Sequence, residues 1–493
     1  MTVDFLSQDD YKYQYMIQVT SSLVDKKDVR SKRLELKLGQ RELALRAGVS
    51  LHQLSQCERG LLLPDALFFK AIARILDTNP TDLCLAQEEL AQKVTPGEGY
   101  VTAQSEKSYK VSRSQLFDPQ KIAVLDLFCG IGGFSHGFER TGAFEVAFGV
   151  DLLSDRITTF TANHPAATAW CEDINDLSLA SLSNYGPAPR IIIGGPPCQG
   201  FSSIRPFRNL TEGDKRNNLF EHFILAVECF RPEWFVMENV VGLLTHKAGA
   251  TLQHIVDLFT QIGYSVDWRI LNAALYGLPQ RRERLLLVGN RQKKCFVWPA
   301  PTHFFDGRSM AGRYGQKMPQ DSLFDMPLLP AVTVMEAIND LPPVSSGQSA
   351  NYYRNDVIAT AYQRLMRGTE DVLRLHDATE HSSRMLEIIR HAGSNKSALP
   401  KGLVSSGFSS SYSRLDPNKP AVTLTVNFVH PASNKCIHPY QDRALTPREG
   451  ARLQSFEDAF LFKGKRAQIV KQIGNAVPPI LGQVIAEAIL AQW

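Results

Sequence analysis

Five short apolar runs between residues 121 and 290 give the first indication of the fold. They read IAVLDLF, FEVAFGVD, RIIIGGP, WFVMENV and RLLLVGN, and they are rich in β-branched and aromatic residues, as buried strands usually are. Segments in which apolar residues recur at helical spacing lie between them. Strands that alternate with helices are typical of a parallel sheet covered by helices. We therefore predict an α/β domain over residues 121–290.

The rest of the chain changes character several times, and no internal repeat is found. Helical patterning returns near both ends of the chain, whereas residues 291–440 mix Gly, Ser, Pro and aromatic residues without a strand–helix rhythm. A polar segment that contains Pro-Gly-Glu-Gly is typical of a linker. The predicted parts besides the α/β domain are an N-terminal extension at 1–24, a small all-α unit at 25–86, a linker at 87–120, an irregular domain at 291–440, and a segment at 441–493 that completes the α/β domain.

The helical unit near the N-terminus contains two predicted helices joined by a tight turn. One helix spans Gln40 to Ala47, Gly48 supplies the turn, and Ser50 is a suitable N-cap for the second helix. The later run LFFKAIARILD fits a closing helix. The residues predicted to form the shared core are Leu43, Ala44, Ala47, Val49 and Leu54.

This pattern resembles the helix-turn-helix domains of the phage-repressor (Cro/CI-like) family. The resemblance implies that the second helix enters the major groove of DNA. Its candidates for base contact are Leu51, His52 and Gln56, while Gln40 would lie near a phosphate. Residues 25–60 carry nine Lys/Arg and five Asp/Glu, a modest excess of positive charge. A helical bundle used only for packing or dimerisation remains the alternative.

Composition narrows the picture without deciding the function. The chain has 493 residues, of which 44% are hydrophobic and 21% charged, as in ordinary soluble proteins. The N-terminal residues lack the pattern of a signal peptide, and no apolar run is long enough to span a bilayer. We therefore expect a cytoplasmic protein that is not attached to a membrane. A net charge of +4 permits nucleic-acid binding but does not require it.

The cysteines argue against a structural metal site. There are eight, and none form a C-x2-C pair, which is the spacing that zinc sites commonly use. We expect free thiols in a reducing compartment, with most of them acting as small packing residues. The prediction for metals is therefore none.

A glycine-rich turn follows the first predicted strand and is a candidate cofactor site. Gly130, Gly132 and Gly133 would let the backbone approach a ligand at the carboxyl end of that strand. No Gly-Lys-Ser/Thr follows, so the turn is not a phosphate loop. Asp151 ends the next strand, where it can accept hydrogen bonds from a ribose, and Asp173 follows the third strand-like segment. The turn alone leaves a nicotinamide cofactor and a methyl donor equally open.

Three kinds of reactive side chain follow later strands. Cys198 comes just after a buried strand and two prolines, Glu238 ends another strand, and Arg282 and Arg284 alternate before a third. A thiol, an acid and a cation are what methylation of cytosine at carbon 5 needs. Addition of a thiolate to carbon 6 activates carbon 5, and an acid that contacts ring nitrogen 3 makes this addition easier. Glu238 would then have to be protonated or act as a hydrogen-bond partner.

Six motifs together resemble the cytosine-5 DNA methyltransferase family, in that family's usual order. They are DLFCGIGG, GGPPCQGFS, ENV, QRRER, LTPREGARLQSF and QIGNAVPP, and they span about residues 121–493. The resemblance implies a Rossmann-like catalytic domain that uses S-adenosylmethionine as its cofactor. It also implies duplex DNA as the substrate, with the target cytosine flipped out of the helix.

The resemblance assigns roles to residues in these motifs. Cys198 matches the nucleophile and Glu238 the acid at the base edge, while Arg284 and Arg282 match arginines near the flipped base and its phosphate. Residues 291–440 would form the target-recognition domain. The cofactor would be held by Phe128 against the adenine, Asp151 at the ribose, Asp173 at the adenine amine and Asn475 at the closing side of the pocket. Arg414, Thr423 and Thr425 are candidates for contacts with DNA.

The resemblance also suggests partners and leaves two alternatives. A modification enzyme is commonly matched by a restriction endonuclease that acts on the same site, and the helix-turn-helix would bind an operator and repress the protein's own promoter. An RNA cytosine methyltransferase with the same chemistry is one alternative. A transcription regulator with a vestigial enzyme domain is the other.

Overall fold

The computed structural model describes residues 27–47, 54, 72, 74–76, 83–84, 108–197, 219–305, 307, 327–405 and 407–493. The chain divides into two compact units, Met1–Gln104 and Ser105–Trp493. Each unit is described separately below.

The N-terminal unit contains the helix that the sequence predicts. Helix α2 spans Val29–Glu35 and α3 spans Gln40–Ala47, so the predicted bounds of the first helix are confirmed. Among the described residues of this unit, the buried hydrophobic side chains are Val29, Leu43, Ala44, Leu54, Ile72 and Leu76. Two-residue strands β1 (Lys27–Asp28) and β2 (Leu83–Cys84) pair in parallel, which adds a short ladder to the predicted all-helical unit. Such short strands leave no periodic signal in a sequence.

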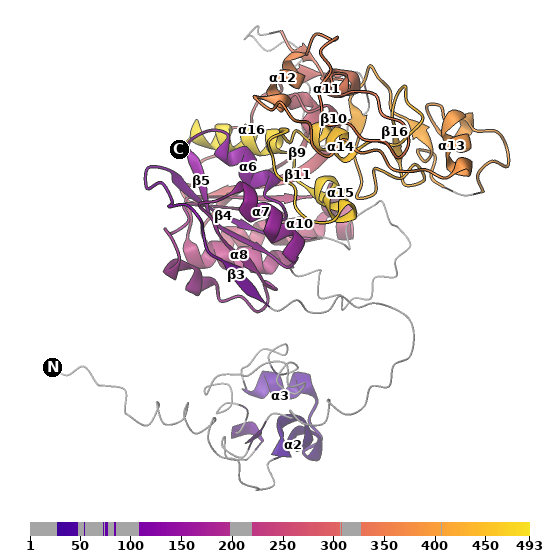
Figure 1. The fold of residues 1–493 in the computed structure, drawn as a ribbon. Helices are drawn as coiled ribbons and strands as arrows, with labels where there is room; N and C mark the ends of the chain where they lie inside the picture. The colour runs from indigo at the N-terminus through magenta and orange to yellow at the C-terminus, as the bar shows by residue number, and fades with distance from the viewer. Residues whose placement is uncertain are drawn as a thin grey trace. The chain divides into compact units, whose positions relative to one another are not determined.

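The second unit is built on one eight-stranded sheet (Figure 1), whose order is β3-β6-β5-β4-β7-β8-β11-β9. The inner strands are parallel, while β3 runs antiparallel to β6, and β11 runs antiparallel to both β8 and β9. The strands are β3 (Tyr109–Val111), β4 (Ile122–Leu127), β5 (Phe144–Asp151), β6 (Thr168–Cys171), β7 (Ile191–Gly194), β8 (Trp234–Asn239), β9 (Ser265–Asn272) and β11 (Glu283–Asn290).

The two edge strands were not among the predicted strands. Strand β3 lies within residues 87–120, which the sequence assigns to a linker, yet Tyr109 pairs with Cys171 and extends the sheet. Its side chains are largely exposed, so it has no apolar run to mark it. Strand β9 at the other edge is half-buried over most of its length. The linker prediction is therefore corrected for residues 109–111.

Helices cover both faces of the sheet because successive strand residues point to opposite sides. One face packs Val124, Ile193 and Val236 with α6 (Gly133–Glu139), α7 (Ser154–Asn163) and α16 (Pro479–Leu490). The other face packs Leu125, Ile192 and other residues with α8 (Leu219–Phe230) and α10 (Ala250–Gln261). The short helices η2 (Leu179–Asn184), α9 (Gly242–Thr245) and η4 (His246–Gly249) lie with α8 and α10, whereas η5 (Ala273–Tyr276) packs with α16 on the first face.

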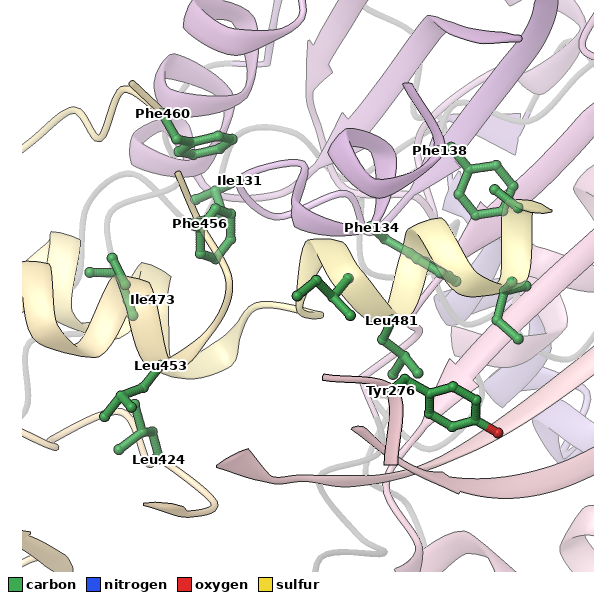
Figure 2. Packing of buried hydrophobic residues seen from close by; sticks show 14 of the residues in the cluster. Ile131, Phe134, Phe138, Tyr276, Leu424, Leu453, Phe456, Phe460, Ile473 and Leu481 are labelled. Carbon is green, nitrogen blue, oxygen red and sulfur yellow. The ribbon is translucent and has the colours of Figure 1, made fainter. Parts of the chain in front are cut away.

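The C-terminal helix α16 packs tightly on α6 (Figure 2). A Cβ added to Gly137 would lie 2.2 Å from the Pro479 carbonyl oxygen, and Gly482 faces Gly137 across the same contact. Only residues without side chains allow two helices to approach so closely. Leu481 fills the space beside Phe134. The C-terminal segment thus packs on α6 of the α/β domain, as the predicted assignment of residues 441–493 to this domain requires.

Residues 327–440 contain few regular elements, as the irregular pattern of the sequence predicts. The helices are α11 (Val334–Ile338), α12 (Ala361–Arg367), α13 (Ser383–Arg390) and η7 (Lys396–Ala398). Two-residue and three-residue strands pair locally: β10 (Gln280–Arg281) with β15 (Ala421–Val422), β12 (His303–Phe304) with β13 (Leu329–Pro330), and β14 (Ser413–Arg414) with β16 (Lys435–Ile437). Apolar residues of this region join the core of the α/β domain.

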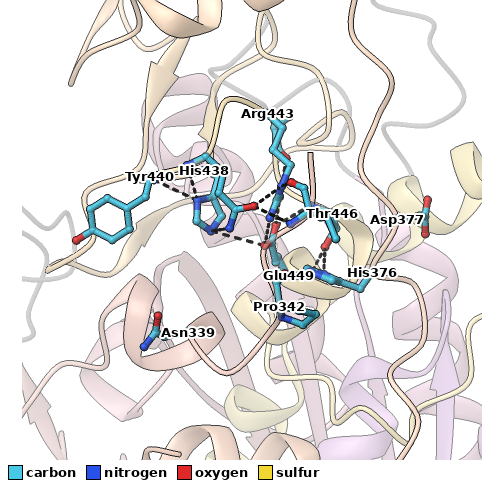
Figure 3. Close-up of polar contacts among 12 residues, drawn as sticks. Asn339, Pro342, His376, Asp377, His438, Tyr440, Arg443, Thr446 and Glu449 are labelled. Carbon is cyan, nitrogen blue, oxygen red and sulfur yellow. Dashed lines mark hydrogen bonds and ion pairs between the residues drawn. The ribbon is translucent and has the colours of Figure 1, made fainter. Parts of the chain in front are cut away.

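Helix α14 (Pro447–Leu453) joins the irregular region to the α/β domain through buried polar contacts (Figure 3). Arg443 makes a two-pronged contact with Glu449, with N–O distances of 2.7 and 2.8 Å. Burial alone would raise the pKa of Glu449, but the charge and hydrogen bonds of Arg443 hold it well below its usual range. His376 bonds to the Thr446 hydroxyl at 3.0 Å and to the Pro342 carbonyl at 2.8 Å. These contacts satisfy polar groups that would be costly to bury alone.

Asp458 is the second anchor of α14. Arg448 and Arg452 both donate to its carboxylate, at distances of 2.7 to 3.1 Å, and the Tyr353 hydroxyl donates at 2.8 Å. Arg452 also pairs with Asp340. All four charged side chains are almost completely buried. Burial alone would raise the pKa of Asp458. The positive charges of Arg452 and Arg448 have a larger, opposite effect, so the pKa lies below its usual value.

Replacing Asp458 with alanine should lower the free energy of unfolding by about 3–5 kcal/mol, because two buried arginines lose their shared partner. Urea denaturation at pH 7 measures this difference. For the wild type, the contribution of this carboxylate is present above its unfolded pKa and is lost as the pH falls through the lower folded pKa. The control is Asp356→Asn, which disrupts an exposed pair with Arg354 of similar length, 2.7 Å and should leave the midpoint unchanged. Equal midpoints for both variants would contradict the role given to Asp458.

One segment among the described residues, Arg466–Leu490, has the length and hydropathy of a membrane span. Pro478 and Pro479 divide it into α15 (Arg466–Asn475) and α16, and more than half of its apolar window is buried inside the unit. It is therefore a pair of core helices.

Candidate active site

The site lies where the strand order reverses. After β4 the chain continues to β5 on one side, whereas β7 flanks β4 on the other side. Leu127, the last residue of β4, is level with Val150 in β5 and Gly194 in β7. The turn after β4 and the loop after β7 therefore leave the same edge of the sheet as neighbours. Open α/β sheets bind their ligands in the crevice formed at such a point.

The glycine-rich turn forms one wall of this crevice. Phe128, Gly130 and Gly132 all have positive φ, at 59°, 55° and 82°. Gly132 precedes the first residue of α6. A Cβ added to Gly130 would have no heavy atom of the described structure within 4 Å, so the backbone there faces open space. This is the wall that a flat ligand can approach closely.

Asp151 closes the turn from β5. Its carboxylate accepts hydrogen bonds from the Gly130 and Leu153 amides, both at 2.9 Å. Burial raises the pKa of Asp151, and these amide bonds offset part of that rise. Asp173 lies two residues beyond β6 and accepts from the Asn175 amide at 3.0 Å. The structure thus places Phe128, Gly130 and Asp151 in one turn, with Asp173 after the neighbouring strand.

A buried histidine that no sequence motif predicts supports the glycine turn. His164 follows α7, lies 32 residues from Gly132, and bonds to the Gly132 carbonyl at 3.2 Å and to Glu139 at 2.7 Å. Burial lowers the pKa of His164, but the charge and hydrogen bond of Glu139 raise it above the usual value. A Cβ on Gly132 would collide with the His164 ring. No local motif links these residues, because only packing of α7 brings them together.

Replacing His164 with glutamine should destabilise the protein by about 1–3 kcal/mol, since Glu139 loses its charged partner within the protein interior. The pair contributes stability below the unfolded pKa of histidine and loses it as the pH rises through the higher folded pKa. The difference from wild type should therefore shrink at alkaline pH, measured by urea denaturation from pH 6 to 9. His254→Gln, on the exposed side of α10, is the control. A difference that grows with pH would contradict the charged pair.

The acid and one arginine form a pair at the end of β8. Glu238 Oε1 lies 2.6 Å from Arg284 Nε, and both side chains are about nine-tenths buried. These residues sit on adjacent antiparallel strands, β8 and β11. The loop after β7 passes close by, because a Cβ on Gly195 would lie 3.0 Å from Glu238 Oε2. Asn239 Nδ2 also donates to the Pro196 carbonyl at 3.3 Å. The loop that leads to Cys198 is thus held against Glu238.

Arg282 occupies a different environment from Arg284. Its guanidinium is buried and donates to the carbonyls of Leu424, Gly474 and Ala476 at 3.0 to 3.3 Å. Burial and the neighbouring Arg284 charge lower its pKa well below the usual range. We therefore correct its expected place beside a flipped base: Arg282 ties three segments of the protein together. These bonds also hold the two residues that flank Asn475, which is itself exposed at the end of α15.

The predicted DNA-contact residues of the irregular domain turn mostly inward. Arg414 donates to four backbone carbonyls, those of Ala392, His438, Gln441 and Ile389, and to Asp442. All of its donors are used inside the domain, so we assign it a structural role in place of the predicted DNA contact. Thr423 donates to the Arg281 carbonyl at 2.8 Å. The Thr425 hydroxyl is buried and has no hydrogen-bond partner among the described residues.

Several predicted residues lie outside the described residues. These are Cys198 and, in the N-terminal unit, Leu51, His52 and Gln56. Gln40, the remaining residue of that predicted surface, is the first residue of α3.

The described cysteines differ in reactivity. Burial raises the pKa of Cys129 well above its usual value and that of Cys436 to about 12, so neither forms a thiolate readily. Cys229 and Cys295 are exposed, which corrects their expected role as packing residues. Among the described residues, no cluster of three or more His, Cys, Asp or Glu could hold a metal ion.

Comparison with known proteins agrees with this geometry. Residues 122–491 match the family model described as C-5 cytosine-specific DNA methylase, and residues 29–83 match a helix-turn-helix model. The chain is 34% identical over 374 residues to the Type II methyltransferase M1.HphI of Haemophilus parahaemolyticus, covering 75% of this chain and 87% of that protein. It is 33% identical to the Type II methyltransferase M.DdeI of Desulfomicrobium norvegicum, covering 74% and 88%.

A solved structure shows the same fold. It is a DNA modification methyltransferase encoded within an E. coli prophage, with a TM-score of 0.58 and 26% identity, and the match covers 75% of this chain and 99% of that one. The family model alone spans about three quarters of the sequence, including every motif that forms the crevice. The chain therefore belongs to the C-5 cytosine-specific DNA methylase family, and it carries a helix-turn-helix domain before the methylase domain.

Proposed function

We propose that this enzyme transfers a methyl group from S-adenosylmethionine to carbon 5 of a cytosine within a specific duplex DNA sequence, through a covalent adduct with Cys198. We further propose that it is the modification component of a restriction–modification system, whose partner is a nuclease that cuts the same sequence. Its relatives M1.HphI and M.DdeI are both named as Type II methyltransferases.

The observation that carries the proposal is the contact between the loop after β7 and the end of β8. Gly195 and Pro196, three and two residues before Cys198, lie against Glu238 and Asn239. A short proline-stiffened loop therefore starts beside the Glu238–Arg284 pair. A thiol, an acid and a cation within one small region can act on a single flipped base.

The reaction divides between these groups. The Cys198 thiolate adds to carbon 6 of cytosine, and the electron pair of the 5,6 double bond makes carbon 5 nucleophilic. Glu238 bonds ring nitrogen 3 and stabilises the charge that develops there. Carbon 5 forms its bond to the methyl group while the donor's sulfur–methyl bond would break and leave its electron pair on sulfur. Carbon 5 then loses its proton to solvent. The returning electron pair restores the double bond and expels the thiolate, so the thiol is regenerated.

The glycine crevice fits the cofactor. S-adenosylmethionine, when bound, supplies an electrophilic methyl group. Phe128, Gly130 and Asp151 would hold it, because the backbone at Gly130 faces open space and the Asp151 carboxylate sits at the adjoining strand end. Asp173 and Asn475 are proposed for the adenine amine and the closing side of the pocket.

Base-resolution sequencing of 5-methylcytosine in cells that express the enzyme tests the proposal. We expect one short sequence to be methylated throughout the genome and unmethylated in cells that carry the empty vector. Absence of any methylated sequence, together with no transfer to duplex DNA by purified protein, would overturn it. A competition between duplex DNA and tRNA for labelled methyl groups tests the RNA alternative, which predicts label in tRNA.

The helix-turn-helix domain supports a second proposed function, repression of the enzyme's own promoter. The matched residues 29–83 and the bounds of α3 favour it, and a modification enzyme benefits from a level matched to its nuclease. Deleting residues 1–86 should raise expression from a promoter-reporter fusion. A Cys198→Ala chain, which keeps the domain but not the activity, should still repress. No change on deletion would exclude this proposal and leave the vestigial-regulator alternative without support.

A further inference from the structure

A small cavity beside Arg281 of the QRRER motif gathers positive charge. It has a volume of about 240 Å³, and Arg281, Lys419 and Lys435 line it together with a single carboxylate, Asp416. These cations come from three separate segments: β10, the turn before β15, and β16. None of these three residues is among the catalytic or cofactor-binding residues that the sequence predicts. Three like charges are brought together only at an energetic cost.

The direction of Arg281 follows from the strand that carries it. Gln280, the preceding residue of β10, is completely buried and donates to the Leu453 carbonyl at 2.9 Å. Since neighbouring strand residues point to opposite faces, Arg281 faces away from that core and into the cavity. Its Nε is buried and has no hydrogen-bond partner among the described residues.

The lysines leave charge uncompensated. Lys419 lies 3.6 Å from Asp416 and is well exposed. Lys435 donates to the Ser394 carbonyl at 3.0 Å, a neutral partner. Burial lowers the pKa of Lys435, Asp416 partly restores it, and the charges of Arg281 and Lys419 lower it again. An anion placed among these three groups would relieve their mutual repulsion.

We propose that Arg281, Lys419 and Lys435 form a binding site for a backbone phosphodiester of the DNA substrate, close to the flipped cytosine. The inference rests on the proposed function, because it takes duplex DNA as the substrate. Arg281 is three residues from Arg284, roughly 10 Å along an extended chain. That distance equals about three base steps of B-form DNA. A duplex whose flipped base reaches Glu238 therefore brings a nearby phosphate to this cavity.

The site positions DNA and takes no part in the chemistry. Phosphate contacts fix the register of a protein on the duplex without reading sequence. They also offset the cost of extruding a base, which is a few kcal/mol. Loss of one contact should therefore weaken target and non-target duplexes alike, leaving kcat at saturating DNA unchanged.

The test compares substitutions that remove a positive charge from the cavity with one that removes its negative charge. Lys435→Gln and Arg281→Gln should each raise the KM for duplex DNA several-fold at 150 mM salt. Each should also reduce the slope of log K against log salt by about one. Asp416→Asn should act in the opposite direction and lower the KM, while its side-chain oxygen can still accept from the Asn418 amide as Asp416 does. Lys293→Gln is the control. Lys293 follows the C-terminal end of β11, whereas Arg281 precedes the N-terminal end of the same strand.

The outcomes separate the possible explanations. An unchanged KM and salt slope in the glutamine variants would overturn the site. So would a weaker affinity in the glutamine variants and in Asp416→Asn together, with a lower Tm in all of them, because that result marks a structural cluster. Inorganic phosphate that stabilises the wild type but not Lys435→Gln, with DNA affinity equal in both, would show a free-phosphate site instead. A wild type that neither methylates nor binds duplex DNA would count against the proposed function itself.

Discussion

Replacing Cys198 with alanine should abolish methyl transfer to duplex DNA, a loss of more than about 10⁴-fold in kcat. Without the thiolate, carbon 5 of cytosine is too weak a nucleophile to attack the methyl group. A free thiol with a pKa near 8.5 is only a few per cent ionised at pH 7, so even this step depends on the surrounding charges. Transfer of label from the methyl donor to an oligonucleotide duplex measures the effect.

Two comparisons make this result specific to the nucleophile. Cys229→Ala removes an exposed thiol from α8 and should keep full activity. A duplex with fluorine at carbon 5 of the target cytosine cannot lose a proton there, so the adduct should persist on the wild type and survive denaturation. The alanine variant should form none. Activity in Cys198→Ala, or an adduct that maps to another residue, would contradict the covalent mechanism.

Replacing Glu238 with glutamine should lower kcat by about 10² to 10⁴-fold, the usual contribution of a positioned acid or base. Glutamine has nearly the same shape and can still donate a hydrogen bond to ring nitrogen 3, but it cannot supply a proton. The ion pair with Arg284, 2.6 Å long in the structure, would be lost as well. Single-turnover kinetics with saturating DNA separates this effect on chemistry from any effect on binding.

The matched control lies at the other end of the same strand. Glu233 immediately precedes β8 and pairs with Arg190 at 2.7 Å. It lies at the N-terminal end of this strand, whereas the crevice lies at the C-terminal end. Glu233→Gln should therefore leave kcat unchanged. If the two glutamine variants have equal rates, or if Glu238→Gln raises only the KM for DNA, then Glu238 binds the base without assisting the reaction.

Local sequence patterns determined which strands form the core of the α/β domain and which residues follow those strands at the site. A buried parallel strand needs apolar residues on both faces, so β4, β5, β7, β8 and β11 are visible as apolar runs. The glycine turn and the proline loop follow such runs, and the acid ends one, because ligands of parallel sheets bind at the carboxyl ends of the strands. The bounds of α3 could be predicted from the helical spacing of its apolar residues and from the glycine that follows Ala47 in the sequence.

The edge strands could not be read in this way. Residues of β3 and much of β9 are exposed or half-buried, so their sequences carry no continuous apolar signal. Their pairing is fixed by the neighbours they meet, β6 and β11. The sequence also placed β3 in a linker, because polar residues around it are shared by linkers and by exposed edges.

The use of each arginine was decided by the tertiary structure. In sequence, Arg282 and Arg284 alternate in one motif and Arg414 lies in a polar segment, so all three suit a phosphate or a base. In the fold, Arg284 pairs with Glu238, and Arg282 is buried against backbone carbonyls of two other segments, at Leu424 and at Gly474 and Ala476. Arg414 uses all of its donors on nearby carbonyls and on Asp442. Sequence determined which residues could carry charge to the site. Which of them face the crevice depended on tertiary partners, which for Arg282 lie 142 to 194 residues away, because a buried charge in the low-dielectric interior needs a partner there.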